Sequence, residues 1–368
     1  MHDLREISRL FDMRAAFLHA SPYGSGHIND TYCAEYQAAG IYIRYIHQRI
    51  NHHVFPHPEK LMENIERVTQ HSLACLLEKN HPEAYRRTLT CIPALDGKSY
   101  ARDAAGNYWR TYPFIERTRS YDTIDNTTQA YQAAYGFGNF QNLTSSLTGK
   151  RLHETIPHFH NTEMRLMHLL DAYAADTHSR AYEVAKEIDF VMQRATETTK
   201  IVNLLNSGSI PERITHNDTK LNNILLDEIT AEGVCVIDLD TTMPGCSLYD
   251  FGDMVRNAVP LLGENSSDLS TMDVRIDIFT ALLDGYLDGA QFLNSTEKEH
   301  LAFAGKLLTL ECGMRFLTDY LQGDRYFKIK SPQQNILRCR NQFALVQALE
   351  RRMTELEDIT MQRVQMRS

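Results

Sequence analysis

The spacing of apolar residues changes near Glu116, and this change constrains the fold more than any other feature of the sequence. Before it, the runs at residues 32–36 and 41–46 are rich in β-branched and aromatic side chains, as is typical of strands. Residues 59–79 carry apolar side chains at helical spacing. After Glu116, long segments with helical spacing dominate the chain. The sequence therefore predicts a small β-rich lobe followed by a larger helical lobe.

Further strands are expected at residues 89–94 and 108–115. We predict an α+β fold with domains at residues 1–116 and 117–368 and a ligand cleft between the two lobes. The helices of the second lobe are expected at residues 128–143, 162–175, 181–206, 271–287, 297–322 and 332–365, with a β-hairpin at residues 224–226 and 234–239 between the third and the fourth.

The most informative stretch lies at residues 214–240. It contains His216, Asp218 and Asn223 in the pattern His-x-Asp-x-x-x-x-Asn, and Asp238 follows at the end of an apolar run. Phosphoryl transfer needs one carboxylate to orient an attacking hydroxyl and accept its proton. It also needs an amide oxygen and a second carboxylate to hold Mg²⁺ against the nucleotide phosphates. Asp and Asn are common in hairpin turns too, but the whole set in a two-lobed chain favours phosphoryl transfer.

The chain resembles the aminoglycoside phosphotransferase and choline kinase family, and within it most resembles the N-acetylhexosamine 1-kinases. The resemblance covers nearly the whole chain and rests on residues 23–32, 215–224, 237–241 and 311–316. It implies a two-lobed protein-kinase-like fold, with a small β-rich N-lobe and a larger, mainly helical C-lobe. It also implies ATP and Mg²⁺ as cofactors and a small-molecule sugar as the phosphate acceptor.

The resemblance also implies roles for the residues of the two catalytic motifs. Asp218 is expected to be the catalytic base and to contact the reactive sugar hydroxyl, with Asn223 and Asp238 as Mg²⁺ ligands. His216 is expected to brace the catalytic loop, and Asp250 to hold that loop through backbone hydrogen bonds.

Two further residues lie beside these motifs. Many relatives have glycine where this chain has Asn217, and asparagine tolerates the left-handed backbone that glycine adopts there. Asp240 is either a second metal ligand or a structural support for the metal site, and we favour support.

The nucleotide is expected to lie between a glycine loop and the interlobe hinge. Two glycines precede the strand at residues 32–36, where the kinase-like fold has its phosphate-covering loop, although a simple turn would use them as well. Residues 112–116 are the expected hinge, whose backbone would meet the adenine. The residues expected to bind the nucleotide here are Gly24, Ser25, Gly26, Pro113, Phe114 and Ile115.

Kinases bind the phosphates with a lysine on the third strand of the N-lobe, usually paired with a glutamate on a helix. The strand expected to correspond to it here, which begins at residue 41, has no lysine. The end of this strand, residues 47–51, offers Arg49 instead. We predict that Arg49 takes this role with Glu66 as its partner, and Glu63 is the alternative partner.

The predicted helix at residues 297–322 has a polar face on which Glu311, Arg315 and Asp319 follow each other at intervals of four. A surface ladder of ion pairs would have the same spacing. The resemblance favours sugar recognition by this face and by residues beside the glycine loop. The residues expected to contact the sugar, in addition to Asp218, are Arg315, Asp319, Tyr320, His27 and Asn29.

Composition narrows the class of partner. The chain has 38 Lys and Arg against 47 Asp and Glu, and its net charge of −9 disfavours binding to nucleic acid or to anionic lipid. No run approaches the roughly 18 apolar residues of a membrane span, and the N-terminus lacks a signal-peptide pattern. Seven scattered cysteines without a CxxC pair fit reduced thiols. We expect a cytoplasmic protein, with a monomer favoured.

The sequence thus predicts an ATP- and Mg²⁺-dependent kinase that phosphorylates the anomeric hydroxyl of N-acetylglucosamine or N-acetylgalactosamine. One alternative is a kinase of another small hydroxyl compound, such as an aminoglycoside, an amino alcohol or a different sugar. A cationic acceptor of this kind would call for an acidic pocket in the C-lobe. The other alternative is a nucleotide-binding pseudokinase.

Overall fold

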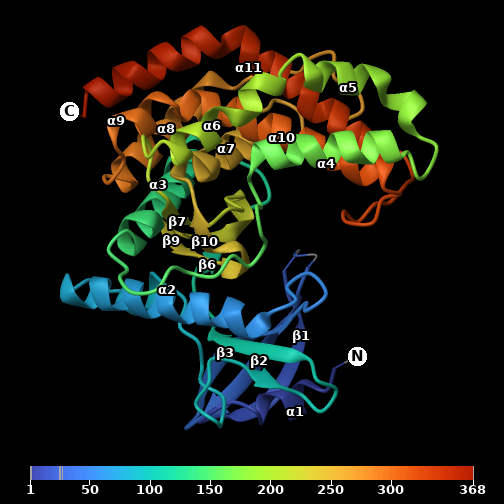
Figure 1. The fold of residues 1–368 in the computed structure, drawn as a ribbon. Helices are drawn as coiled ribbons and strands as arrows, with labels where there is room; N and C mark the ends of the chain where they lie inside the picture. Colours follow the sequence, from blue (N-terminus) through green and yellow to red (C-terminus); the bar gives the residue numbers. More distant parts are fainter. Residues whose placement is uncertain (1, 25, 27, 368) are drawn as a thin grey trace.

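The computed structural model describes residues 2–24, 26 and 28–367, which form two lobes. The N-lobe, at the bottom of Figure 1, is built on one antiparallel sheet, and the larger C-lobe above it is mainly helical. The predicted α+β fold with a small β-rich N-lobe and a larger helical C-lobe is confirmed. No helix in these described residues is long and apolar enough to cross a lipid bilayer.

The N-lobe sheet has the strand order β1-β2-β3-β5-β4. Its tightest turn lies at Ala39 and Gly40, whose φ angles of 49° and 83° suit the two-residue hairpin between β2 and β3. Trp109 and the short helix α1 form an apolar cluster against one face of this sheet. The bounds are α1 (Leu4–Ser8), β1 (Ala16–Pro22), β2 (Asp30–Ala38), β3 (Ile41–Ile50), β4 (Ala101–Arg102) and β5 (Tyr108–Pro113).

The long helix α2 (Pro58–Glu78) lies between this sheet and the C-lobe in Figure 1. Proline is favoured in the first turn of a helix, where its missing N–H costs nothing. The buried stripe of α2, including Leu61, Ile65 and Val68, belongs to the same apolar core as the C-lobe helices. This shared core fixes the N-lobe against the C-lobe. The 3₁₀ turn η1 (Ala84–Arg86) follows α2.

Two small sheets at the top of the cleft position the polar loops of the site. One has the order β6-β8-β9, and the other pairs β7 with β10. The predicted hairpin at residues 224–226 and 234–239 is confirmed by the pairing of β8 with β9. The bounds are β6 (Thr118–Arg119), β7 (Arg213–Thr215), η4 (Leu221–Asn223), β8 (Ile224–Asp227), β9 (Gly233–Val236), η5 (Leu239–Thr241) and β10 (Met243–Gly245).

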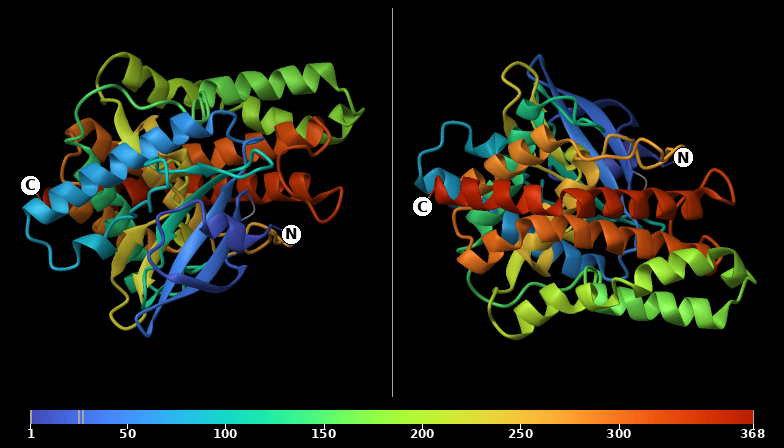
Figure 2. Two further views of the ribbon diagram at one scale, coloured as in Figure 1. Left: turned by 90° about the horizontal axis from the view of Figure 1, so that it is seen from below. Right: turned by 90° about the horizontal axis from the view of Figure 1, so that it is seen from above.

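The C-lobe helices pack in layers around α10, which runs beside α11 while α4 and α5 flank one side (Figure 2). Helix α7 approaches α10 so closely that a Cβ atom on Gly252 would lie 2.5 Å from the Ala304 carbonyl oxygen. The bounds are α3 (Thr127–Thr144), α4 (Thr162–Ala175), η2 (Ala181–Val184), α5 (Ala185–Met192), η3 (Ala195–Thr199), α6 (Lys200–Asn206), α7 (Ser247–Ala258), α8 (Ile276–Gly289), α9 (Ser295–Glu299), α10 (Leu301–Leu321) and α11 (Gln334–Gln365).

The helix predicted at residues 297–322 is interrupted at residue 300, and the one predicted from residue 271 begins at Ile276. Two other predicted elements differ more. Residues 89–94 form no strand, because Pro93 interrupts the run and only single contacts to neighbouring segments remain, such as the 2.8 Å bond from the Ile92 N–H to the Thr111 carbonyl. The helix expected at residues 181–206 is divided into short pieces. Thr198 and Thr199 donate their hydroxyls to nearby backbone carbonyls there, which favours 3₁₀ geometry over a continuous α-helix.

Candidate active site

The loop between β7 and β8 carries His216, Asp218 and Asn223, and α7 holds it in place. The carboxylate of Asp250, in the first turn of α7, accepts hydrogen bonds from the backbone N–H groups of His216 at 2.9 Å and Asn217 at 2.7 Å. Asp250 is fully buried. This contact is the one that the family resemblance implies for Asp250, and it fixes the backbone immediately before Asp218.

Asn217 has a positive φ of 64°, in the left-handed region that asparagine tolerates. Its side-chain amide donates to the carbonyl of Thr215 at 3.2 Å and to that of Thr241 at 2.9 Å. Asparagine thus supplies the backbone conformation of a glycine. It also ties the catalytic loop to the segment that follows Asp238.

His216 braces the loop from the other side. Its Nε2–H donates to the Ile237 carbonyl at 2.9 Å, and its Nδ1 accepts from the Asp218 N–H at 3.2 Å. Both ring nitrogens are therefore engaged, and the ring is fully buried. The imidazole links the backbone of the two catalytic motifs.

The Asp218 carboxylate has a cationic neighbour and an amide neighbour. Lys220 Nζ lies 2.8 Å from Oδ1, and Asn223 Nδ2 donates to Oδ2 at 3.1 Å. Burial by itself would raise the pKa of Asp218, but the charge and hydrogen bond of Lys220 outweigh it, and the pKa falls to about 2. Asp218 is therefore ionised at neutral pH, and Lys220 stands beside it at the cleft.

Asn223 and Asp238 offer the oxygens of a metal site. The amide nitrogen of Asn223 also donates to the Asp218 carbonyl at 2.8 Å, and its Oδ1 has no partner among the described residues. Asp238 has a φ of 58° and lines the cavity between the lobes. Withdrawal from bulk solvent in the cleft, with the nearby carboxylates of Asp240 and Asp218, raises the pKa of Asp238 to about 6.

This donor set fits Mg²⁺. Three carboxylates that repel one another leave a place for a cation between them, and Mg²⁺ prefers oxygen ligands. In the described part of the chain, no group of three or more His, Cys, Asp or Glu residues could hold a metal by itself. Mg²⁺ typically takes one or two protein ligands and completes its shell with phosphates and water, which matches two ligands from the chain.

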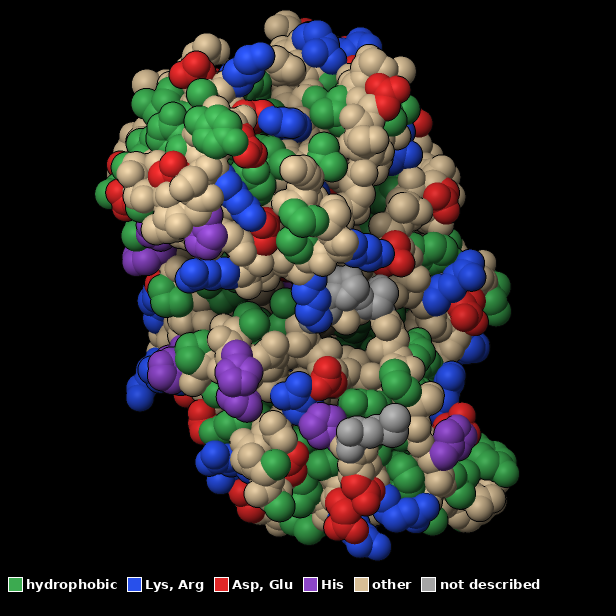
Figure 3. Space-filling model, turned by 90° about the vertical axis from the view of Figure 1, so that its right-hand side faces the viewer, with side chains coloured by type: hydrophobic (Ala, Val, Ile, Leu, Met, Phe, Trp, Pro, Cys, Tyr) green, Lys and Arg blue, Asp and Glu red, His purple; other side chains and the backbone are tan. Residues whose placement is uncertain are grey.

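The cleft contains a cavity of about 180 Å³ that joins both lobes. The surface is hollowed between the lobes in Figure 3, with Lys and Arg side chains along the upper rim. Ser25 and His27, two of the predicted binding residues, lie outside the described residues. The lining residues come from the glycine loop, β3, the hinge, the catalytic loop and the metal motif; they include Gly24, Gly26, Ile46, Gln48, Leu89, Pro113, Phe114, Ile115, Asn223, Leu225, Ile237 and Asp238.

The prediction that Arg49 faces the phosphates and pairs with Glu66 is wrong. Neighbouring residues of a strand point to opposite faces of its sheet, and it is Gln48 that lines the cavity. Arg49 lies opposite Trp109 on the other face and pairs with Asp30, Nε to Oδ2 at 2.7 Å. Glu66 instead accepts a bond from Gln70, and the alternative partner Glu63 contacts His153.

Arg110 of β5 lies opposite Gln48, on the same face of the sheet. Its guanidinium donates to the Gln48 amide oxygen from Nε at 2.9 Å and to Oδ1 of Asp240. Asn29 Nδ2 donates to the other carboxylate oxygen of Asp240 at 2.6 Å. Both carboxylate oxygens of Asp240 are hydrogen-bonded within the protein, which favours the predicted role as a support over that of a second metal ligand.

Asn29 therefore does not reach the acceptor as predicted. Its amide nitrogen is committed to Asp240, and its Oδ1 accepts from the Asn51 N–H at 2.9 Å. The side chain connects the glycine-loop segment to the C-lobe.

Two of the predicted sugar contacts on α10 are also wrong. The carboxylate of Asp319 is buried and accepts from the backbone N–H groups of residues 325, 326 and 327 at 2.8–3.0 Å, and from Asn335. The hydroxyl of Tyr320 donates to Glu183 at 2.6 Å, on the side of η2. Both side chains hold C-lobe segments together. Their positions along the helix do not reveal whether a polar side chain binds a ligand or another segment of the protein.

Arg315 remains available to an acceptor. Its guanidinium lies 4.8 Å from the ring centroid of Phe159 and 5.7 Å from that of Phe327, and it has no hydrogen bond or ion pair with any described residue. Arg165 lies nearby, and burial together with the charge of Arg315 lowers the pKa of Arg165. Two cations thus share this side of the C-lobe.

A buried chain of contacts connects this helix to the catalytic loop. Glu311, one turn before Arg315, pairs through Oε1 with His160 Nδ1 at 2.7 Å. His160 Nε2–H donates to the Asn217 carbonyl at 2.9 Å, next to Asp218. Helix α10 therefore contacts the backbone that carries the catalytic carboxylate.

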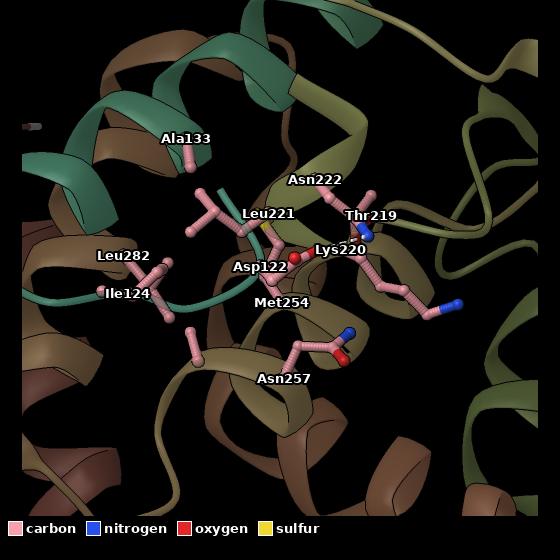
Figure 4. Close-up of a pocket in the computed structure, with 11 residues that line it drawn as sticks. Asp122, Ile124, Ala133, Thr219, Lys220, Leu221, Asn222, Met254, Asn257 and Leu282 are labelled. Carbon is pink, nitrogen blue, oxygen red and sulfur yellow. Dashed lines mark hydrogen bonds between the residues drawn. The ribbon is translucent and has the colours of Figure 1, made fainter. Parts of the chain in front are cut away.

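A second, smaller cavity of about 80 Å³ lies behind the catalytic loop, between the loop, α3, α7 and α8. Figure 4 shows the Lys220 side chain leaving this cavity, while Ile124, Ala133 and Leu282 form its apolar wall. The cavity belongs to the packing that supports the loop, while the ammonium of Lys220 contacts the Asp218 carboxylate.

Residues 19–292 match the phosphotransferase enzyme family, which is well over half of the chain. The chain belongs to this family. An aminoglycoside phosphotransferase from Alicyclobacillus acidocaldarius has a similar structure, with a TM-score of 0.58 and 12% identity over 96% of this chain and 97% of that one. A choline kinase from Cryptosporidium parvum has a TM-score of 0.54 and 12% identity, covering 92% and 90%. An ethanolamine kinase from Plasmodium vivax has a TM-score of 0.54 and 15% identity over 88% of this chain and 82% of that one.

The phosphotransferase family predicted from the motifs is thus confirmed, and the solved structures confirm the protein-kinase-like fold. The predicted cofactors, ATP and Mg²⁺, are those of the phosphotransferases in this family.

Three residues of the phosphotransferase site were not predicted from the sequence. Lys220 has a signal, since a basic residue two positions after the motif aspartate falls on the same loop. Arg110 has a weaker one, an arginine inside an otherwise apolar strand, where a charge is buried only if it is paired. His160 has none, because its partners Glu311 and Asn217 lie far away in the sequence.

Proposed function

We propose that the protein is an ATP- and Mg²⁺-dependent kinase that phosphorylates the anomeric hydroxyl of N-acetylglucosamine or N-acetylgalactosamine. The observation that carries the phosphoryl-transfer part is the meeting of Asp218, Asn223 and Asp238 at the catalytic end of the cleft. Asn223 bonds Asp218, and both Asn223 and Asp238 line the cavity that reaches the hinge.

Each residue has a role in this reaction. Asp218, held by its bond with Asn223, orients the anomeric hydroxyl and accepts its proton. The hydroxyl oxygen forms a bond to the γ-phosphorus while the bond to the β–γ bridging oxygen breaks, and ADP leaves. Asn223 and Asp238 would hold Mg²⁺, which neutralises charge on the phosphates. Lys220 lies at the cleft, where its ammonium favours the negative charge of the γ-phosphoryl group.

The hinge side of the cavity suits an adenine. Ile46, Leu89, Phe114 and Ile237 give it apolar walls, and the backbone of residues 113–115 offers hydrogen-bonding groups. Of the predicted nucleotide contacts, Gly24, Gly26, Pro113, Phe114 and Ile115 remain part of the proposal, whereas Arg49 does not.

The charge beside the catalytic loop supports a neutral acceptor over a cationic one. An aminoglycoside or an amino alcohol would need acidic partners, whereas Arg315 and its neighbour Arg165 are cations. A guanidinium that has no polar partner among the described residues and is flanked by aromatic rings suits the hydroxyl and acetamido oxygens of a hexosamine. Arg315 is therefore the proposed acceptor contact on α10.

An acceptor panel tests the proposed function. ADP release would be measured with ATP and Mg²⁺ across N-acetylglucosamine, N-acetylgalactosamine, glucose, galactose, choline and kanamycin. We expect turnover with the two N-acetylhexosamines and little with choline or kanamycin. Preference for kanamycin or choline would overturn the acceptor and keep the Asp218 chemistry, while nucleotide binding without turnover of any acceptor would favour a pseudokinase.

A further inference from the structure

We propose that Arg110 is a positioning residue that acts through Asp240 on the turn carrying Asp238, in a chain whose third strand has no lysine to bind the phosphates. This inference rests on the proposed nucleotide and Mg²⁺ site but not on the identity of the acceptor.

None of the described sheet residues that line the cavity is a cation. The polar residue of β3 that lines the cavity is Gln48, whose Nε2 donates to Thr31 Oγ1 at 2.9 Å. Arg49 faces the other way. The amide oxygen of Gln48 accepts two bonds from Arg110, from Nε at 2.9 Å and from Nη2 at 2.6 Å. The Arg110 guanidinium on β5 thus lies behind Gln48, the neutral residue on the face of the sheet where kinases have the lysine.

Arg110 is too deeply buried to meet the nucleotide itself. Its side chain is only 1% exposed and that of its partner Asp240 only 4%. Two charges so buried carry a large desolvation cost, so they are kept only where they are paired and hydrogen-bonded. The pair crosses from β5 of the N-lobe to η5 of the C-lobe. Its effect on the nucleotide must therefore pass through η5.

The turn that receives this contact is the one that carries the metal ligand. Asp240 follows Asp238 by two residues, and the hydroxyl of Thr155 donates to the Asp240 carbonyl at 2.8 Å. A second contact from the N-lobe comes from α2, where the amide of Asn64 donates to the Thr242 carbonyl at 3.1 Å. With the bond from Asn29, three N-lobe side chains hold residues 240–242.

The same contacts connect the glycine loop to the metal site. Asn29 follows the loop directly and shares the Asp240 carboxylate with Arg110. Loss of the Arg110 charge would leave Asp240 buried without its counter-ion beside Asp238, and the turn would no longer present Asp238 at a fixed place. Binding of the nucleotide together with Mg²⁺ should suffer, whereas metal-free binding through the hinge should not.

The experiment compares ADP affinity by titration calorimetry with Mg²⁺ and with EDTA. The variants are Arg110→Met, which keeps the length without the charge, Asp240→Asn, which keeps the shape, and Arg110→Lys, which keeps the charge alone. Arg49→Met is the matched control, since it removes an arginine from the outer face of the same sheet. Thermal unfolding of each variant checks its fold, and Asp240→Asn and Arg110→Lys carry the test if Arg110→Met does not fold.

We expect Arg110→Met and Asp240→Asn to weaken Mg²⁺-dependent ADP binding by about 10- to 100-fold, the usual effect of losing a residue behind a metal ligand. Arg110→Lys should lie between them and the wild type, and Arg49→Met should match the wild type. Wild-type affinity in Arg110→Met, or an equal loss with Mg²⁺ and with EDTA, would overturn the inference alone. Absence of Mg²⁺-dependent ADP binding in the wild type would instead overturn the proposed function together with it.

Discussion

Asp218 is the single residue on which the proposed chemistry depends most. Asn223 and Lys220 hold its carboxylate, and His216 and Asp250 fix the backbone around it. A side chain held from so many sides should tolerate an isosteric change without moving its neighbours. Its chemical role can therefore be separated from its structural one.

We expect Asp218→Asn to lower kcat by about 10²- to 10⁴-fold, because the amide cannot accept the hydroxyl proton. ADP affinity and the unfolding temperature should stay near the wild-type values. Steady-state kinetics and calorimetry measure both, and the exposed Asp268→Asn serves as control. Nearly full activity in Asp218→Asn would exclude Asp218 as the base.

Arg315 tests the acceptor side of the cleft. Arg315→Met removes a charged hydrogen-bond donor worth about 1.5–3 kcal/mol, so kcat/KM for the acceptor should fall at least about tenfold. The KM for ATP should not change. Arg340→Met, on the exposed side of α11, is the control and should behave like the wild type. A change in the KM for ATP with no change in kcat/KM for the acceptor would place Arg315 outside the acceptor site.

The sequence predicted correctly that residues on one loop come together. It failed where the face of a strand or the cover of a helix decides what a side chain contacts. Asp218 and Asn223 come together because their spacing on one loop leaves little choice. Arg49 and Gln48 differ by one position on a strand, which is enough to exchange the cleft face for the outer face. Asp319 follows Arg315 at helical spacing, yet a loop of the C-lobe covers it.

Among the elements, α10 links Arg315, the proposed acceptor contact, to the loop that carries Asp218. Burial lowers the pKa of His160, but the charge and hydrogen bond of Glu311 outweigh it, so the pKa lies above its ordinary value of 6.5. A raised pKa in the folded state means that the protonated histidine stabilises the fold. That contribution is complete below the pKa of the unfolded chain and is lost as the pH rises through the folded value.

Glu311→Gln should therefore destabilise the protein more at low pH than at high pH. We expect a loss of about 1.5–3 kcal/mol near pH 6, where the imidazolium loses a charged partner. The difference from the wild type should shrink towards pH 9. Chemical denaturation of both proteins at the two pH values measures it, and a difference that does not depend on pH would refute the ion pair.

Helices and strands were predictable where the sequence has clear apolar periodicity. Helix α4 and the hairpin of β8 and β9 have clear apolar periodicity, and the structure has them where expected. Helix α7, which carries Asp250, was not predicted, because Gly252 in its middle is a poor helix former. The glycine is needed for the close approach to Ala304 of α10, a contact that no local pattern reveals.

At the scale of the whole molecule, residues from both lobes line the cavity. Gly24, Gln48 and Phe114 come from the N-lobe, and Asn223 and Asp238 from the C-lobe. A ligand that touches both sides binds only the assembled fold and so stabilises it. The two-lobed arrangement was predictable from the change near residue 116, but the buried contacts between the lobes join residues distant in sequence and could not be foreseen.

Mg²⁺ and ADP together should therefore raise the free energy of unfolding, by about 2.7 kcal/mol when ADP is at a hundred times its Kd. EDTA should reduce this gain, as should Asp238→Asn. Asparagine is the right replacement, because it tolerates the positive φ of 58° at this position. Thermal unfolding with each ligand measures the effect, and an equal gain with EDTA would argue against a metal held by Asp238.

The most direct test of the central claim is the position of the phosphate on the product, read by phosphorus NMR after reaction with N-acetylglucosamine, ATP and Mg²⁺. The account predicts a single sugar 1-phosphate that disappears in Asp218→Asn. A phosphate on any other hydroxyl, or product formed equally by Asp218→Asn, would contradict it.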